Sequence, residues 1–193
     1  MARILLARHG LSSYETDLMT DDGGSLTPQG RRQARALGYV ALAAGVTKVW
    51  CSPMSRAVQT AELAAAVAGV DEVEVRQDLR EYSVGDLAGR SLADEAALLM
   101  PVFEAWMAGD DLAMVPGADQ TSAIVQRVSR VLEQIATELG PDGVALVVSH
   151  GGAIMTTVPV LTGGSRNDAL NFVLGGGANL VLVRDETGWS LEG

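Results

Sequence analysis

The chain has 193 residues, 48% of them hydrophobic, and we expect one domain with a sizeable core spanning residues 1–193. Its formal net charge of −10 argues against nucleic acid and anionic membranes as principal partners, because both bind positively charged surfaces. Cys51 is the single cysteine, so no internal disulfide can form, and no apolar run reaches the ~18 residues of a membrane span. We therefore expect a cytoplasmic protein.

Strand and helix patterns alternate along most of the chain. Short apolar or β-branched runs predict strands over 3–8, 48–52, 72–75 and 143–149. Capping and stop residues predict helices over 27–45 (Thr27 to Gly45), 52–69 (Ser52 to Gly69) and from 119 or 121 to 139. The segment 179–192 resembles a hairpin. This order predicts an α/β fold with a mostly parallel central sheet, helices on both faces and an antiparallel edge.

Both histidines of the chain end an apolar run and precede a glycine. His9 lies in "LLARHGLSSYE" and His150 in "ALVVSHGGA". In an open parallel sheet the ligand crevice lies beyond the carboxyl ends of the strands, so the two imidazoles are predicted to meet there. The strand that ends at Cys51 and Ser52 brings the turn before Arg56 to the same crevice.

The predicted crevice holds a basic pocket in an otherwise acidic protein, and such a pocket favours a phosphoryl group as ligand. Its members are Arg8, His9, Arg56 and His150. Arginine makes permanently charged, bidentate contacts to phosphate, and a neutral imidazole is a competent nucleophile toward phosphorus. A lone histidine at a strand end is more often a structural residue, and the repeated setting is what favours catalysis.

Five motifs resemble, in the same order, those of the phosphoglycerate mutase-like histidine phosphatases. They are "RHG" at 8–10, "LTPQGRRQA" at 26–34, "SPMSRAVQTA" at 52–61, "LREYSVGDLAG" at 79–89 and "SHGG" at 149–152. The resemblance implies a three-layer α/β/α sandwich, no cofactor or metal, and catalysis through a phosphorylated histidine.

The resemblance also implies a role for each matching residue. His9 is similar to the nucleophile, and Glu81 to the proton donor that assists the leaving alkoxide and then accepts a proton from water. The clamp on the phosphoryl oxygens is matched by Arg8, Arg56 and His150. The backbone N–H of Gly151, at a predicted helix start, adds a further donor.

Two positions depart from the family pattern. Glu15 replaces an asparagine that commonly contacts phosphate, and a carboxylate there would repel the phosphoryl group. Either Glu15 turns away and Ser12 or Ser13 donates instead, or Glu15 tunes the site. Asp119, in "PGADQ", stands where many relatives have "PGGES", and the sequence assigns it no role.

No metal site is predicted, because the resemblance assigns both histidines to phosphoryl chemistry. Asp21 and Asp22 are the nearest approach to a carboxylate site. Paired acidic residues in a Gly-rich loop are far more often solvated turn residues, which is how we interpret them.

The segment 91–118 is predicted to be a partly helical lid, because the family commonly inserts its substrate cover after the glutamate motif. Its large side chains include Phe103 and Trp106, and its charges are all acidic. If these side chains face the phosphate, aryl or neutral-tailed phosphomonoesters should be better substrates than 3-phosphoglycerate. The alternative is that they pack in the core or in a homodimer contact.

The sequence therefore predicts a metal-independent hydrolase of small phosphomonoesters that acts through a phosphohistidine. A phosphoglycerate mutase is the first alternative, but it needs additional cations, and residues 91–126 contain no lysine or arginine. A phosphatase acting on protein side chains would be favoured by an open site without a lid. A non-catalytic phosphate-binding or interaction protein is the last alternative, and the retained His9 and Glu81 argue against it.

Overall fold

A computed structural model describes residues 1–13, 18–21, 23–91 and 95–192, so Glu15 and Asp22 lie outside the described residues. A six-stranded sheet has the order β5-β4-β6-β1-β7-β8. Its strands are β1 (Ala2–Arg8), β4 (Lys48–Cys51), β5 (Val73–Val75), β6 (Val144–Ser149), β7 (Asn179–Asp185) and β8 (Gly188–Leu191). Two further short strands, β2 (Ser12–Ser13) and β3 (Ser25–Leu26), pair with each other.

Four strands of the large sheet run parallel, and two add an antiparallel edge. β6 pairs in parallel with β1 on one side and with β4 on the other, and β4 pairs in parallel with β5. β7 is antiparallel to β1, and β8 is antiparallel to β7. The mostly parallel sheet and its antiparallel hairpin edge are thus confirmed.

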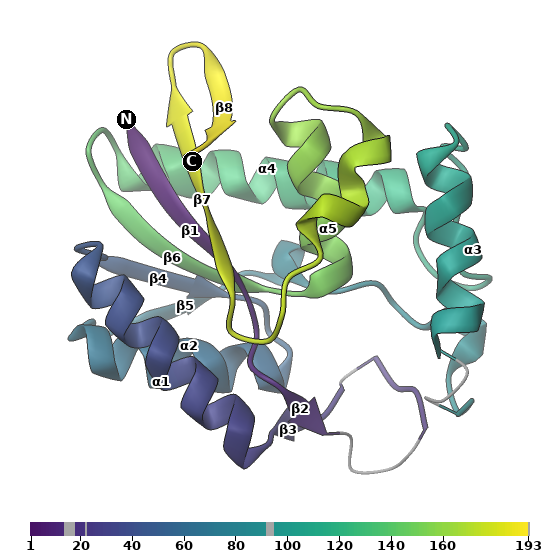
Figure 1. Ribbon diagram of the computed structural model, residues 1–193, viewed down its shortest axis with the longest axis horizontal. Helices are drawn as coiled ribbons and strands as arrows, with labels where there is room; N and C mark the ends of the chain where they lie inside the picture. The colour runs from purple at the N-terminus through teal and green to yellow at the C-terminus, as the bar shows by residue number, and fades with distance from the viewer. Residues whose placement is uncertain (14–17, 22, 92–94, 193) are drawn as a thin grey trace.

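Helices cover both faces of this sheet, which gives the expected three layers (Figure 1). The helices are α1 (Pro28–Ala43), α2 (Ser55–Ala68), α3 (Glu95–Met107), α4 (Thr121–Leu139) and α5 (Gly151–Leu161). α1 and α2 lie on one face, α4 and α5 lie on the other, and α3 stands apart from the sheet. Within the described residues, no helix combines the length and the apolar character needed to cross a bilayer.

The two-residue period of β1 explains why the sheet needs helices on both faces. Ile4 and Leu6 belong to the core with α4 and α5, whereas Leu5 and Ala7 belong to the core with α1 and α2. All four side chains are buried, as expected for a strand inside a parallel sheet. The sheet therefore holds its strand ends rigidly between two packed layers.

Helix ends follow the predicted signals in α1 and depart from them in α2. Thr27 accepts the Gly30 N–H at 3.0 Å, which confirms it as the N-cap of α1. Gly69 ends α2 with a positive φ of 75°, also as expected. The helix predicted to start at Ser52 instead begins at Ser55, because Ser52 lies at the strand end, where its hydroxyl contacts His150.

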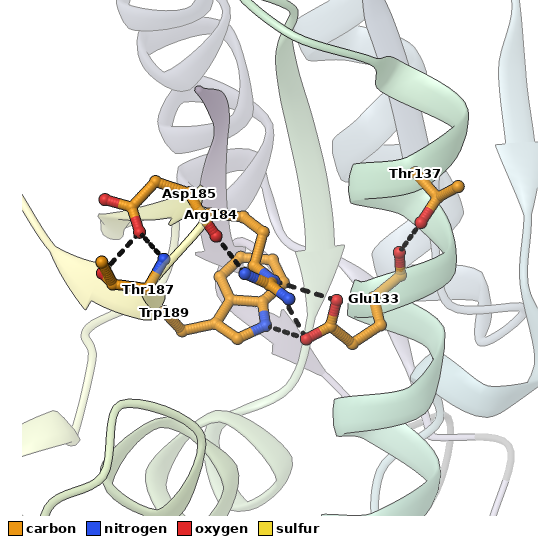
Figure 2. Close-up of polar contacts among 6 residues, drawn as sticks. All are labelled: Glu133, Thr137, Arg184, Asp185, Thr187 and Trp189. Carbon is orange, nitrogen blue, oxygen red and sulfur yellow. Dashed lines mark hydrogen bonds and ion pairs between the residues drawn. The ribbon is translucent and has the colours of Figure 1, made fainter.

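The C-terminal hairpin is fastened to α4 through Glu133. Figure 2 shows the side chains of Arg184 and Trp189, which belong to β7 and β8, both pointing toward this carboxylate. Arg184 Nε donates to both Glu133 oxygens at 3.1 Å, and Trp189 Nε1 donates to one of them at 2.6 Å. These contacts join the antiparallel edge of the sheet to the helical layer beside it.

Candidate active site

Three neighbouring parallel strands end side by side at one edge of the sheet. In the paired register, Cys51 of β4 lies opposite Val148 of β6, and Ser149 of β6 lies opposite Arg8 of β1. The residue that directly follows the strand is Ser52 after β4, His150 after β6 and His9 after β1. The connections from β1 and β6 leave in opposite directions across the sheet, so these residues lie at a topological switch point.

His9 is held in one tautomer by its two ring nitrogens. Nδ1 lies 2.8 Å from the carbonyl oxygen of Gly10, which can only accept, so Nδ1 carries the proton. Nε2 accepts the Nε–H of Arg56 at 3.0 Å. The lone pair of the imidazole is therefore on Nε2, on the side of the ring that faces a guanidinium group.

Arg56 is buried at the start of α2, with 5% of its surface exposed. Its guanidinium group also donates to Met54 Sδ at 3.5 Å. Gly23 has a positive φ of 62°, and a Cβ built on it would lie 1.7 Å from Arg56 Nη1. The loop before β3 thus needs glycine at this position to leave room for the arginine.

Arg8 reaches the site from the end of β1. Its Nη1 donates to the Leu174 carbonyl at 2.7 Å, and its buried Nε has no hydrogen-bond partner among the described residues. A Cβ added to Gly151 would lie 3.3 Å from Arg8 Cζ, so the guanidinium lies close against the first residue of α5.

His150 is fully buried behind the site. Its Nε2 lies 2.7 Å from Ser52 Oγ, and its Nδ1 has no hydrogen-bond partner among the residues that the structure describes. The rings of His9 and His150 lie with their centroids 5.2 Å apart. The structure thus brings the two histidines together, as predicted.

Both imidazoles are neutral at physiological pH. Burial, assisted by the charges of Arg56 and Arg8, lowers the pKa of His9 to about 3. Burial and the charge of Arg56 likewise hold the pKa of His150 well below its ordinary value. A neutral His9 keeps its Nε2 lone pair, which is the state that a nucleophile requires.

Glu81 caps the start of α5. Its Oε1 accepts the N–H groups of Ala153 at 2.8 Å and Tyr82 at 3.1 Å, and its Oε2 accepts the N–H of Gly152 at 2.9 Å. Oε2 has one hydrogen bond where Oε1 has two, so Oε2 has more free acceptor capacity. The partly positive N-terminus of α5 holds this carboxylate in place.

Most predicted site residues line one cavity of about 310 Å³, which we term the histidine cavity. Its walls are Arg8, His9, Gly10, Leu11, Ser12, Arg56, Glu81 and Gly176. Arg8, His9, Ser12, Arg56 and Glu81 are therefore together, as predicted. His150 contacts this group from behind and does not itself line the cavity.

Glu81 also borders a second cavity of about 370 Å³, which we term the arginine cavity. Its other walls are Asp21, Met54, Gln77, Arg80, Tyr82, Ser83, Asp119 and Arg127. Asp21 is exposed in a bend, as predicted for a solvated turn residue, and its carboxylate also accepts the Ser83 hydroxyl at 3.1 Å and the Val84 N–H at 2.7 Å. These bonds join the loop before β3 to the segment that carries Glu81.

The described part of the segment 91–118 lines neither cavity. Trp106 is 1% exposed and packs with Val125, Met155 and Ala169 in a separate hydrophobic cluster. Phe103 contacts the ring of Tyr82 edge to face at 5.2 Å. The segment therefore supports the wall behind Glu81, and its large side chains do not form the predicted apolar cover.

Sequence reasoning missed three contributors to the site. The sequence pattern indicates a helix cap at Ser52, whereas the structure places its hydroxyl against His150. The sequence predicts no role for Leu174 or Gly176. In the structure, Leu174 supplies a carbonyl to Arg8, and Gly176 lines the histidine cavity. The run of three glycines at 175–177 was an available signal, because glycine clusters often mark a close approach of the backbone. The contact of Ser52 with His150 spans 98 residues and has no local signature.

Within the described residues, no group of three His, Cys, Asp or Glu side chains could hold a metal ion. The predicted absence of a metal requirement stays a prediction, to be tested on the active protein.

The chain is similar to known proteins over nearly its whole length. The profile of the histidine phosphatase superfamily (branch 1) matches residues 4–193. "Putative phosphoserine phosphatase 2" of Hydrogenobacter thermophilus is 30% identical over 165 residues, which cover 84% of this chain and 80% of that protein. "Phosphoglycerate mutase-like protein 4" of Arabidopsis thaliana is 25% identical over 195 residues, which cover 99% of this chain and 84% of that protein.

Solved structures show the same fold. A mycobacterial glucosyl-3-phosphoglycerate phosphatase, 24% identical, superposes with a TM-score of 0.80 over 98% of this chain and 96% of that one. The alpha-ribazole phosphatase of Shigella flexneri, also 24% identical, superposes with a TM-score of 0.78 over 98% of this chain and 94% of that one. The arrangement of sheet and helices is thus one that several phosphatases share.

Proposed function

Because the chain belongs to the histidine phosphatase superfamily, branch 1, we propose that it hydrolyses small phosphomonoesters through a covalent phosphohistidine on His9. Its class is that of a phosphoric monoester hydrolase. The observation that carries the mechanism is the lone pair of His9 Nε2, held beside Arg56 in a cavity that Glu81 also borders. We further propose that the enzyme needs no metal and works in the cytoplasm.

The first chemical step follows from this arrangement. A phosphoryl oxygen takes the Arg56 N–H that His9 Nε2 now accepts, and this exchange frees the Nε2 lone pair to attack phosphorus. Arg8, with its buried Nε unpartnered among the described residues, contacts a second phosphoryl oxygen. The P–O bond to the alcohol breaks as the P–N bond to His9 forms.

Glu81 completes both half-reactions. Its Oε2, with more free acceptor capacity than Oε1, holds the proton that passes to the leaving alkoxide. The resulting carboxylate then takes a proton from water, which attacks the phosphohistidine and releases phosphate. His150, neutral and buried behind His9, donates its Nδ1 proton to the phosphoryl group as this group moves toward the ring.

This geometry does not support the predicted preference for phosphomonoesters with neutral leaving groups. That prediction depended on an apolar, acidic lid facing the phosphate, yet Trp106 is in a separate cluster. Arg80 and Arg127 line the cavity next to Glu81, where a substrate's alcohol part would lie. Homodimer formation and the absence of nucleic-acid binding stay predictions.

The experiment that tests the function is capture of the phosphoenzyme. Wild-type protein mixed with ³²P-labelled p-nitrophenyl phosphate without added metal, then quenched, should carry an acid-labile, alkali-stable label. His9→Ala should carry none and lose nearly all turnover, while it still binds inorganic phosphate through the two arginines. Equal labelling of both proteins would refute His9 as the nucleophile, and activity that requires an added divalent cation would refute metal independence.

A further inference from the structure

The arginine cavity is placed to receive the part of the substrate that leaves. Glu81 lines both cavities, and its carboxyl group has to lie beside the oxygen that joins phosphorus to the alcohol. On this role of Glu81, an ester with its phosphoryl group in the histidine cavity would direct its alcohol part past Glu81, toward the arginine cavity. The side chains of the arginine cavity then decide which alcohol is accepted.

Two charged groups in this cavity already have partners. Arg127 donates to the carbonyl oxygens of Asp78 at 2.7 Å, Arg80 at 2.8 Å and Glu81 at 3.2 Å. Asp21 accepts two hydrogen bonds from the segment after Tyr82. These groups build the wall, and three of the five N–H donors of Arg127 are already used within it.

The side chains of Arg80 and Asp119 are different. Among the described residues, neither makes a hydrogen bond or an ion pair within 4 Å, although both line the cavity. Arg80 is half-buried and directly precedes Glu81, and Asp119 is exposed just before α4. The cavity thus presents a guanidinium and a carboxylate whose side chains have no hydrogen-bonding partner among the described residues, and the charge of Asp119 also acts on Arg127 in the same wall.

Resting on the function proposed above, we propose that the arginine cavity selects phosphomonoesters whose alcohol part carries both a carboxylate and an ammonium group. Arg80 binds the carboxylate, since a guanidinium makes charge-assisted contacts to both carboxylate oxygens. Asp119 binds the ammonium group. Both residues act as specificity determinants, and neither contacts the atoms that react.

Other alcohol parts fit this cavity less well. A second phosphate dianion would meet the carboxylates of Asp21, Asp119 and Glu81 in the same space, and like charges oppose its binding. A purely apolar group would leave Arg80 and Asp119 desolvated without partners. A zwitterion satisfies both charges and adds no net charge.

Four substrates at fixed ionic strength separate the two contacts. O-Phosphoserine carries both groups, and 3-phosphoglycerate has a hydroxyl in place of the ammonium. Phosphoethanolamine lacks the carboxylate, and p-nitrophenyl phosphate lacks both. Wild type should show its highest kcat/KM among the three alkyl esters on phosphoserine, with the loss of either group lowering it by about 10-fold or more.

Two variants and a matched control assign the contacts. Arg80→Gln should lower kcat/KM by about 10- to 100-fold on phosphoserine and 3-phosphoglycerate, mainly through KM, and leave phosphoethanolamine and p-nitrophenyl phosphate unchanged. Asp119→Asn should lower it on phosphoserine and phosphoethanolamine only. Arg130→Gln removes a cation of α4 that pairs with Asp78, and it should leave the whole ranking unchanged.

The outcomes distinguish this inference from the proposed function. If wild type hydrolyses p-nitrophenyl phosphate through labelled His9 but ranks the alkyl esters equally, the subsite is refuted and the function stands. An equal loss on all four substrates in Arg80→Gln would also refute it, because that loss would mean a disturbance of Glu81. If no phosphomonoester is hydrolysed, the proposed function itself fails.

Discussion

At the residue scale, Ser52 links the end of β4 to the second histidine. Its Oγ accepts the Met54 N–H at 3.3 Å and lies 2.7 Å from His150 Nε2. The hydroxyl proton can then be donated to Nε2, which leaves the imidazole proton on Nδ1. We therefore expect Ser52 to act as a positioning residue, through the tautomer of His150.

Ser52→Ala should lower kcat by about 100-fold with little change in KM, because a misoriented donor weakens the contact most in the transition state. Ser55→Ala is the matched control, since Ser55 is three residues away and exposed, and among the described residues its hydroxyl receives a hydrogen bond from Gln59 alone. Steady-state kinetics on p-nitrophenyl phosphate measure both. Identical kinetics in the two variants would show that Ser52 does not position His150.

Single residues differ in how far sequence reasoning could place them. Arg8, His9, Arg56 and Glu81 lie in short motifs whose resemblance to a family already implies their roles, and they line one cavity. The contacts of Asp21 could not be predicted, because its partners lie 62 and 63 residues further along the chain. The local rule about turns describes its exposed position in a bend correctly, but it carries no information on tertiary contacts.

α5 and the segment 79–81, which carries Glu81, hold each other in position through hydrogen bonds. Glu81 receives two N–H groups from the first turn of α5, and Ser149, at the end of β6, donates to the Leu79 carbonyl at 2.9 Å. Glu81 is therefore held by the same strand–helix junction that carries His150. A small shift of α5 would move Glu81 relative to His9.

Glu81→Gln should reduce kcat on alkyl phosphates by about 100- to 10,000-fold and on p-nitrophenyl phosphate much less. Nitrophenolate leaves without much help from a proton, whereas an alkoxide does not. The amide also replaces one acceptor oxygen at the start of α5, so urea unfolding should show a loss of about 1 kcal/mol. Equal kinetic losses on both kinds of substrate would assign Glu81 to positioning alone.

Elements with clear period and capping signals were predictable, and the others had specific obstacles. α1 and β1 combine an apolar pattern with recognisable ends, and α4 has an apolar pattern and a glycine at its C-terminal end. α3 and α5 each contain an internal proline, Pro101 or Pro159, which normally argues against a continuous helix. β2 and β3 are two residues long, too short for any periodic pattern.

The whole molecule is acidic, but its candidate active site contains a buried arginine and two buried histidines. The net charge is −10, yet Arg56 is buried in the first turn of α2, where its guanidinium group donates to His9. The same burial keeps both histidines uncharged. Folding therefore depends on pH through these two side chains, since protonating either one places a new positive charge beside the guanidinium groups of Arg56 and Arg8.

The sign of this dependence follows from the lowered pKa values. The unfolded chain binds protons on both histidines below about pH 6.5, while folded His9 stays neutral down to a pKa of about 3. Stability is therefore fully present above pH 6.5 and falls with decreasing pH, by up to about 1.4 kcal/mol per pH unit for each histidine. Urea unfolding between pH 7.5 and 5 should show this slope, above the range where most carboxylates titrate. His9→Gln should lose about half of it, because only His150 then contributes. Parallel pH profiles for wild type and His9→Gln would show that His9 gains a proton as readily in the folded state as in the unfolded chain.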